Sequence, residues 1–133
     1  MWWSKYIGIP FVDKGRDFSG CDCWGLVRLV FAEEHGFLLP SWHTHDGAES
    51  IQRIYLDEVM PRFKKVESYQ PFAIPLLRAS KTLYHVGIMV DPERMLHAAE
   101  GKDVCVEPMR QYLCRLNGLY LPHGWTTRAA EQP

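Results

Sequence analysis

The segment Ser19–Val30 (SGCDCWGLVRLV) combines residue types and a spacing that suit covalent chemistry. Asp22 is a good N-cap and Gly20 precedes it, so a helix is expected to begin at Cys23. A thiol in the first turn of a helix lies where free N–H groups and the helix dipole favour the thiolate. The pattern therefore predicts that Cys23 is a nucleophile. The helix has a buried face formed by apolar residues at helical spacing, namely Leu26, Val27, Val30 and Phe31.

The other cysteines offer alternatives. Cys21 is the rival nucleophile, but it precedes the cap and lies outside the reach of the helix dipole. A cysteine at a helix start can also be a small buried hydrophobic residue. The four cysteines are too few and too scattered for a disulfide scaffold, and they lack the paired C-x-x-C pattern of a structural zinc site. We therefore expect Cys23 to be the reactive thiol.

A cysteine nucleophile needs a base, and two histidines occur at a suitable spacing. His97 follows His85 by twelve residues, and the turn Asp91–Arg94 lies between them. The pattern predicts a β-hairpin over Val86–Ala98 whose register, or an equivalent bulge, pairs Gly87 with His97. His85 and His97 would then be diagonal neighbours on one face, with their backbones roughly 7–8 Å apart and their side chains within reach of each other. We expect His85 to be the general base and His97 to fix its tautomer and orientation.

Metal and cofactor chemistry has little support in the sequence. His43, His45 and Asp46 could imitate a metal site, but a His-x-His pair in a loop is not specific for one. We therefore expect no metal site and no cofactor.

The elements that must position these residues fall into a helical first half and a β-rich second half. Residues 1–9 predict a short helix or turn that buries Trp2, Trp3, Tyr6 and Ile7. Helices are expected at Cys23–His35, with Gly36 as its C-terminal stop, and at Ala48–Met60. A further short helix is expected near Met109–Leu116.

After Pro61 the apolar period changes to that of strands. Pro75 lies inside one of the expected strands and predicts either a sheet edge or a bulge there. Helices followed by strands predict an α+β fold with an antiparallel sheet, in a single domain over residues 1–125 with a flexible tail at 126–133. The expected strands are Phe63–Val66, Ile74–Arg78, Tyr84–Val90, Met95–Ala99, Val104–Val106 and Leu119–Leu121.

The composition excludes some classes of partner. Hydrophobic residues make up 47% of the chain and charged residues 23%, which is ordinary for a globular domain. A net charge of −1 gives no electrostatic reason to expect nucleic acid. No apolar run approaches the roughly 18 residues that span a membrane, so no membrane insertion is expected. The first residues also lack the pattern of a signal peptide, which predicts synthesis in the cytoplasm.

At these residues the chain resembles the NlpC-type cell-wall cysteine peptidases, part of the papain-like clan. Asp22–Val27 matches the family's nucleophile motif, roughly Asp-Cys-Ser-Gly-Phe/Leu-Val, and His85–Met89 matches its motif His-Val-Gly-Ile-Tyr. Leu96–Ala98 matches its third motif, often a histidine in an Ile-His-Ala context. The likeness covers about residues 6–107. It implies a papain-like domain with N-terminal helices packed on an antiparallel sheet, and Cys23, His85 and His97 as its catalytic residues.

Two aromatic residues depart from the family pattern. Phe11 stands where the family usually has a tyrosine near the nucleophile, and Trp24 replaces the usual serine. The likeness implies that Phe11 and Trp24 line the cleft, with Asp22 as a further substrate-binding residue. Family members associated with bacteriophage tails commonly read Asp-Cys-Trp-Gly-Leu-Val, which Asp22–Val27 reproduces.

The resemblance thus implies a cysteine-type endopeptidase that hydrolyses amide bonds in peptidoglycan stem peptides. It further implies a component of a phage or prophage tail tip that aids cell-wall penetration or tail assembly. Its partners would be the stem peptide and other tail-tip proteins, and it would act from the virion tail at the host cell wall.

Two other functions are consistent with parts of the sequence. A structural tail-tip assembly subunit with a degenerate or occluded site would account for Phe11 and Trp24. A papain-like acyltransferase or amidase would use the same residue types, but its histidine usually precedes its cysteine. The order here, with Cys23 before His85, argues against that class.

Overall fold

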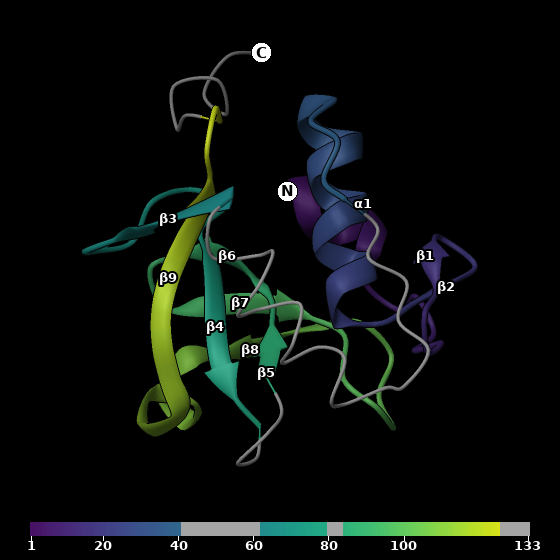
Figure 1. Cartoon of the computed structure of the whole chain (residues 1–133). Coiled ribbons are helices and arrows are strands. Elements are labelled where there is room, and N and C mark those ends of the chain that lie inside the picture. The colour runs from purple at the N-terminus through teal and green to yellow at the C-terminus, as the bar shows by residue number, and fades with distance from the viewer. Residues whose placement is uncertain (41–61, 80–83, 126–133) are drawn as a thin grey trace.

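The computed structural model describes residues 1–40, 62–79 and 84–125 (Figure 1). The helix expected at Ala48–Met60 and the tail expected at 126–133 lie outside these residues. In chain order the elements are the 3-10 helix η1 (Trp2–Tyr6), β1 (Arg16–Asp17), β2 (Gly20–Cys21), α1 (Cys23–His35), β3 (Phe63–Val66), β4 (Ile74–Arg78), β5 (Tyr84–Val86), β6 (Ile88–Asp91), β7 (Arg94–His97), β8 (Cys105–Pro108), the 3-10 helices η4 (Met109–Gln111) and η5 (Leu113–Arg115), and β9 (Leu116–Pro122).

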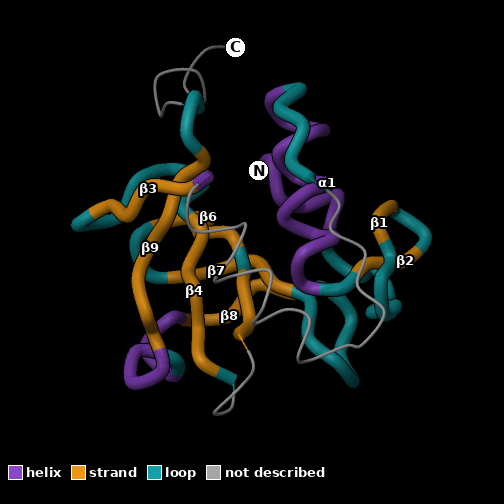
Figure 2. Tube along the Cα trace, viewed as in Figure 1, coloured by secondary structure: helices purple, strands orange, loops and turns teal. Residues whose placement is uncertain are grey.

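The strands form three antiparallel sheets, with the orders β3-β9-β4-β5, β6-β7-β8 and β1-β2. Figure 2 shows α1 standing beside the strands of the two larger sheets, with the small β1-β2 pair on the far side of the helix. The fold is therefore α+β with a helix packed on antiparallel sheets, which confirms the predicted class. Across the described ranges, none of the helices combines the length and the apolar character that crossing a bilayer would require.

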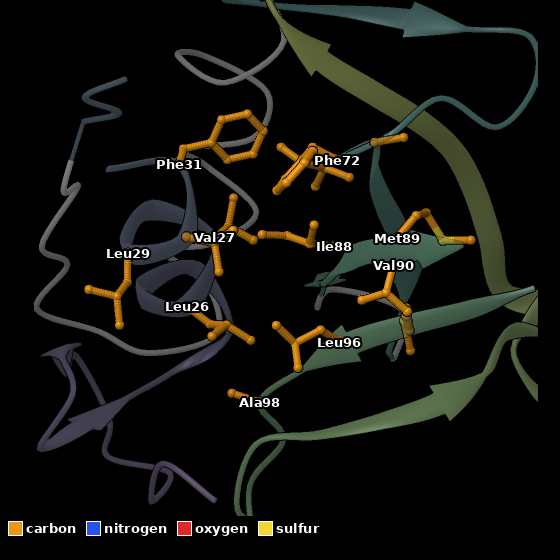
Figure 3. Close-up of a cluster of buried hydrophobic side chains, with 14 of the residues drawn as sticks. Leu26, Val27, Leu29, Phe31, Phe72, Ile88, Met89, Val90, Leu96 and Ala98 are labelled. Atoms are coloured by element: carbon orange, nitrogen blue, oxygen red, sulfur yellow. The ribbon is translucent and has the colours of Figure 1, made fainter. Parts of the chain in front are cut away.

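The helix α1 has the bounds that its sequence predicts. Asp22 caps its start, and Gly36 ends it in the left-handed conformation at a φ of 62°. The four predicted core residues Leu26, Val27, Val30 and Phe31 are all fully buried. Figure 3 shows this face of the helix directed toward Ile88 of β6 and Leu96 of β7, which are also fully buried. Packing of this apolar face, more than helix propensity, holds α1 in place.

The strand predicted over Tyr84–Val90 is divided at Gly87, where the chain passes from the β4-β5 pair to the β6-β7 pair. A Cβ atom on Gly87 would lie 2.8 Å from the backbone oxygen of Leu96 and 3.2 Å from the Cβ of His97. Only glycine allows this approach, so Gly87 is both the point where the chain changes sheet and the space for the His97 side chain.

Two local predictions are corrected or refined by the structure. β4 lies between β9 and β5, but Pro75 pairs only with Leu119 of β9, because the register with β5 begins at Leu76. A register shift between Leu76 and Leu77 leaves Asn117 of β9 unpaired. Pro75 thus lies where β4 has a paired strand on one side only, and the bulge is on β9, next to this position and not at Pro75 itself. The expectation that Ile7 packs inward is wrong: η1 ends at Tyr6, which is fully buried, and Ile7 is 47% exposed.

Candidate active site

Cys23 is the first residue of α1, and Asp22 fixes the chain just before it. One carboxylate oxygen of Asp22 accepts a hydrogen bond from the backbone N–H of Gly25 at 2.7 Å and forms an ion pair with Arg16 at 2.8 Å. The other oxygen accepts from the backbone N–H of Lys14 at 3.0 Å. The predicted N-cap is confirmed, and Asp22 also ties the preceding loop to the helix start.

A glycine in the first turn of α1 brings that loop closer still. A Cβ atom on Gly25 would lie 2.0 Å from the backbone oxygen of Gly15, which is closer than any real contact. A glycine inside a helix normally costs about 1 kcal/mol relative to alanine, so this position is explained by the close approach of the loop. Together Gly25 and Asp22 hold Cys23 in one orientation.

His85 and His97 meet as the predicted hairpin requires. Ile88 pairs with Leu96 and Met89 with Met95, and a bulge at Val90 completes the turn. His85 lies on β5 and His97 on β7, and Nε2 of His85 is 2.8 Å from Nδ1 of His97. His97 is 2% exposed. The predicted proximity of the two imidazoles and the bulge are therefore confirmed, while His85 and His97 belong to two different sheets and not to one hairpin face.

The nucleophile and base candidates share one cavity of about 310 Å³. Helix α1 packs against β5, and the backbone N–H of Val86, the residue after His85, donates to the Cys23 sulfur. The cavity is lined by Phe11, Cys23, Leu77, Arg78, Ala79, His85, Ala98, Ala99, Glu100, Tyr112 and Arg115. A helix and a sheet that are far apart in the sequence thus bring a thiol and an imidazole to the same hollow.

Burial of Cys23 opposes the stabilisation of its thiolate that the helix start offers. Burial raises the pKa of the Cys23 thiol to about 11, and it outweighs the N–H groups of Val86 and Trp24, which lower it. Burial, assisted by repulsion from His97 and Arg115, lowers the pKa of His85 to about 4. At neutral pH both groups are therefore uncharged. This arrangement suits general-base activation of the thiol during attack, with no resting ion pair.

The sequence does not single out the residue that ends this chain of hydrogen bonds, Glu107. Its Oε1 lies 2.8 Å from Nε2 of His97, on the side of the imidazole away from His85. Glu107 is on β8, where Cys105 pairs with His97, so Glu107 is the diagonal neighbour of His97 on the same face. An acidic residue two positions after the strand partner of His97 could have identified Glu107 as a neighbour of the histidine. This signal can be used only once the β7-β8 register is known.

Of the three predicted substrate-binding residues, the structure places only one at the cavity. Phe11 lines the cavity. Trp24 is not among the lining residues, since its Nε1 donates to the backbone oxygen of Pro40 at 2.8 Å and its ring packs edge-on against Phe63. Asp22 is also not a lining residue, and its contacts are those of the cap and the loop. The geometry supports a substrate contact for Phe11 alone.

The rival nucleophile Cys21 is fully buried and does not line the cavity. Burial, together with the nearby charge of Asp22, raises the pKa of its thiol to about 12. Cys21 pairs with Phe11 in an isolated parallel bridge, which ties the segment around Phe11 to the residues just before the helix. Its position favours a structural role and leaves Cys23 as the thiol that faces the cavity.

One group in the described part of the chain has the composition of a metal site. The ligand atoms of His97, Cys105 and Glu107 lie within 4.8 Å of one another. However, the ammonium of Lys102 already lies 2.9 Å from the same Glu107 oxygen that faces His97. The existing cation satisfies this carboxylate, so we assign no metal to it. The other candidate group, His43, His45 and Asp46, lies outside the described residues.

In this α+β domain a thiol and an imidazole line one cavity, and a second histidine is hydrogen-bonded to the first, an arrangement that suits nucleophilic chemistry at the thiol. This chain belongs to the NlpC/P60 family, whose sequence profile matches residues 8–116.

Curated relatives share part of this chain. It is 24% identical over 111 residues to the murein DD-endopeptidase MepS/murein LD-carboxypeptidase of Escherichia coli K12, which covers 82% of this chain and 52% of the relative. It is 29% identical over 111 residues to protein P54 of Enterococcus faecium, covering 81% of this chain and 19% of that protein. The chain thus spans about half the length of the first relative and a fifth of the second.

Solved structures of the same family share the fold. The NlpC/p60 domain of the peptidoglycan hydrolase SagA superposes with a TM-score of 0.65 at 23% identity, covering 90% of this chain and 92% of that domain. An NLP/P60 family protein similar to lipoprotein from Staphylococcus aureus gives a TM-score of 0.62 at 21% identity, covering 90% of this chain and 38% of that one. These likenesses establish the fold.

Proposed function

We propose that this chain is a cysteine-type endopeptidase that hydrolyses amide bonds in the stem peptides of peptidoglycan. The observation that carries the proposal is that Cys23 and His85 line one cavity while His97 holds His85 at 2.8 Å. Membership of the NlpC/P60 family and the names of its relatives, a murein endopeptidase and a peptidoglycan hydrolase, support this substrate.

The reaction begins with two neutral groups. As the sulfur of Cys23 attacks the amide carbonyl carbon, its proton passes to the free ring nitrogen of His85 and a C–S bond forms. Backbone N–H groups at the start of α1 stabilise the oxyanion. The His85 imidazolium then protonates the leaving amine as the C–N bond breaks. His85 next deprotonates a water that attacks the thioester, which releases the carboxylic acid and returns the proton to sulfur.

The charges around the cavity suit a peptide that carries free ionic groups. Arg78 and Arg115 offer two cations and Glu100 one anion, while Phe11 and Tyr112 supply apolar surface. Within the described residues, neither arginine takes part in an ion pair, and Arg115 lies over the Tyr112 ring at 5.0 Å, so both can meet a substrate carboxylate. Stem peptides contain such carboxylates beside their amide bonds, which supports the proposed substrate class.

We further propose that the protein acts at the host cell wall as part of a phage or prophage tail tip, together with other tail-tip proteins. Support comes from the segment Asp22–Val27, which has the form common among tail-associated members of the family. In the folded chain this segment places Trp24 against Pro40 and Phe63, at the side of the helix start. Trp24 is not among the residues that line the cavity, so it does not fill it.

The test compares wild type with Cys23→Ala on purified sacculi. We expect wild type to release soluble peptide fragments and the variant to release none, because no other group in the cavity can form the thioester. Cys114→Ala is the matched control, since Cys114 is exposed and outside the cavity. Chromatography and mass spectrometry of the released fragments measure the activity and locate the cleaved bond.

Equal release by wild type and Cys23→Ala would contradict the catalytic assignment. No release by either protein, with normal assembly of infectious tails by Cys23→Ala, would favour the structural tail-tip subunit with an occluded site. Cys23 is 9% exposed, so an occluded site is the specific alternative that this experiment separates.

A further inference from the structure

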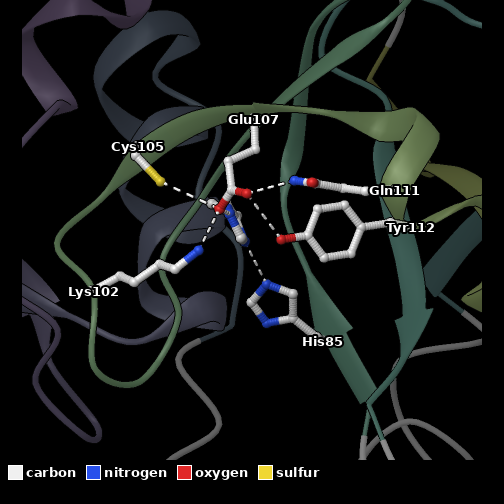
Figure 4. Close-up of polar contacts among 7 residues, drawn as sticks. His85, Lys102, Cys105, Glu107, Gln111 and Tyr112 are labelled. Carbon is white, nitrogen blue, oxygen red and sulfur yellow. Dashed lines mark hydrogen bonds and ion pairs between the residues drawn. The ribbon is translucent and has the colours of Figure 1, made fainter.

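Glu107 is a carboxylate at the centre of a polar network that reaches the proposed base. Figure 4 shows Glu107 between Lys102, Gln111 and Tyr112, with His85 further along the same chain of hydrogen bonds. Lys102 and Nε2 of His97 contact one oxygen at 2.9 and 2.8 Å, and Gln111 and Tyr112 donate to the other. The Glu107 side chain is 17% exposed: its contacts with His97 and Tyr112 are partly buried, and those with Lys102 and Gln111 are exposed.

The direction of each hydrogen bond follows from Glu107. Partial burial alone would raise its pKa, but the hydrogen bonds from Lys102 and His97 lower the pKa of Glu107 to about 2. Glu107 is therefore a carboxylate at neutral pH, and a carboxylate can only accept. Nε2 of His97 must carry the proton that Glu107 accepts.

The same reasoning extends to the next imidazole. Burial lowers the pKa of His97, so its ring is neutral and its Nδ1 carries no proton. That nitrogen can only accept, so Nε2 of His85 must donate to it across 2.8 Å. His85 is also neutral, which leaves its Nδ1 as the ring nitrogen with a free lone pair.

We propose that Glu107 is a positioning residue: acting through His97, it fixes the tautomer of His85 so that Nδ1 stays free to take the thiol proton of Cys23. This inference rests on the proposed function, because it gives Glu107 a task in the same site. Glu107 does not line the cavity, so it acts on the base and not on the substrate. When His85 becomes an imidazolium, the same carboxylate stabilises the positive charge through His97.

The test is Glu107→Gln, which keeps the size of the side chain but can offer an amide N–H to His97. Nε2 of His97 would then accept, the His97 proton would move to Nδ1, and His85 would carry its proton on Nδ1, where it blocks proton uptake. NMR of the ring nitrogens in 15N-histidine-labelled protein reports these tautomers without any substrate. We expect Nδ1 of His85 to be unprotonated in wild type and protonated in the variant.

Kinetics on a stem-peptide substrate give the second readout. We expect kcat to fall about 10- to 100-fold, the range typical when the outer partner of a functional histidine is removed, with KM unchanged. Gln111→Ala is the matched control, because it removes a donor from the other oxygen of Glu107 and leaves the path to His97 intact. It should preserve both the tautomers and kcat.

Two results would overturn the inference: a protonated Nδ1 on His85 in wild type, or unchanged tautomers and kcat in folded Glu107→Gln. The wild-type spectrum decides the first even if the variant does not fold. Because the NMR readout needs no hydrolysis, it also separates failure of this inference from failure of the proposed peptidase function.

Discussion

Cys23 and His85 line the same cavity, yet burial moves their pKa values in opposite directions, up to about 11 for the thiol and down to about 4 for the imidazole. For a resting ion pair the order of these two values would have to be reversed. The free protein therefore holds a neutral base beside a neutral acid over a wide range of pH. Activity should depend on protonation of His85 at the acid end of this range.

A nearby charge can move the acid limb of the pH profile, which is the pH range over which activity is lost as His85 becomes protonated. After burial and His97, the positive charge of Arg115 also lowers the pKa of His85. Arg115→Met removes this charge, so the pKa of His85 should rise and the acid limb of kcat/KM should shift to higher pH. We expect a shift below about one unit, because Arg115 is exposed and screened by solvent. A pH profile of stem-peptide hydrolysis from pH 3 to 9 measures it.

Arg110→Met is the control, since it removes the same charge from an exposed residue that does not line the cavity. Its acid limb should coincide with that of wild type. A limb that stays in place or moves to lower pH in Arg115→Met would contradict the assignment of the limb to His85.

Among the elements, α1 depends most on one close contact. Gly25→Ala would place a methyl group 2.0 Å from the backbone oxygen of Gly15, and neither backbone can yield without moving the loop or the helix start. We expect the free energy of unfolding to fall by about 1–3 kcal/mol, as for other overpacked sites. Urea unfolding followed by circular dichroism measures the change.

The exposed Glu33→Ala in the same helix should change the stability by no more than about 0.5 kcal/mol. If Gly25→Ala were as stable as this control, the close approach of Gly15 would not restrict the helix start. A displaced helix start should also lower the rate of hydrolysis, because Cys23 begins the helix.

The local elements were open to prediction, and the contacts between distant elements were not. The cap, the bounds of α1 and the His85–His97 register follow from neighbouring residues, namely Asp22, Gly36 and the turn after Val90. The place of Glu107 depends on how β8 pairs with β7 after the chain from Ala98 to Val104, and no local pattern sets that register. The rise in the pKa of Cys23 does not follow from the sequence for a similar reason, since its burial depends on packing against β5, which lies about sixty residues later.

At the scale of the whole molecule, folding depends on pH because three histidines among the described residues have lowered pKa values. Burial lowers the pKa of His85, His97 and His35, so each resists protonation in the folded state. Unfolding returns them to an ordinary pKa near 6.5, and below that value the unfolded chain binds more protons than the folded one. Stability should therefore be full above about pH 6.5 and decrease as the pH falls.

The loss should be greatest between the two pKa values of His85, 6.5 unfolded and about 4 folded, and we expect it to reach about 3 kcal/mol from this residue. Urea unfolding at a series of pH values from 7.5 to 4 measures it. His85→Gln removes the titrating group, so its stability should depend less steeply on pH over this range. An equally steep dependence in the variant would show that His85 is not a source of acid instability.

The apolar face of α1 has a consequence for how mutations of this protein should be read. Cys23 opens the helix whose side chains Leu26, Val27 and Phe31 face β6 and β7. A close-packed interior shifts when its volume changes, so an altered core would tilt or slide the helix and carry the sulfur with it. The rate of turnover therefore depends on how the core is packed. A substitution far from the cavity can lower activity by moving the helix, even though no reacting group has changed.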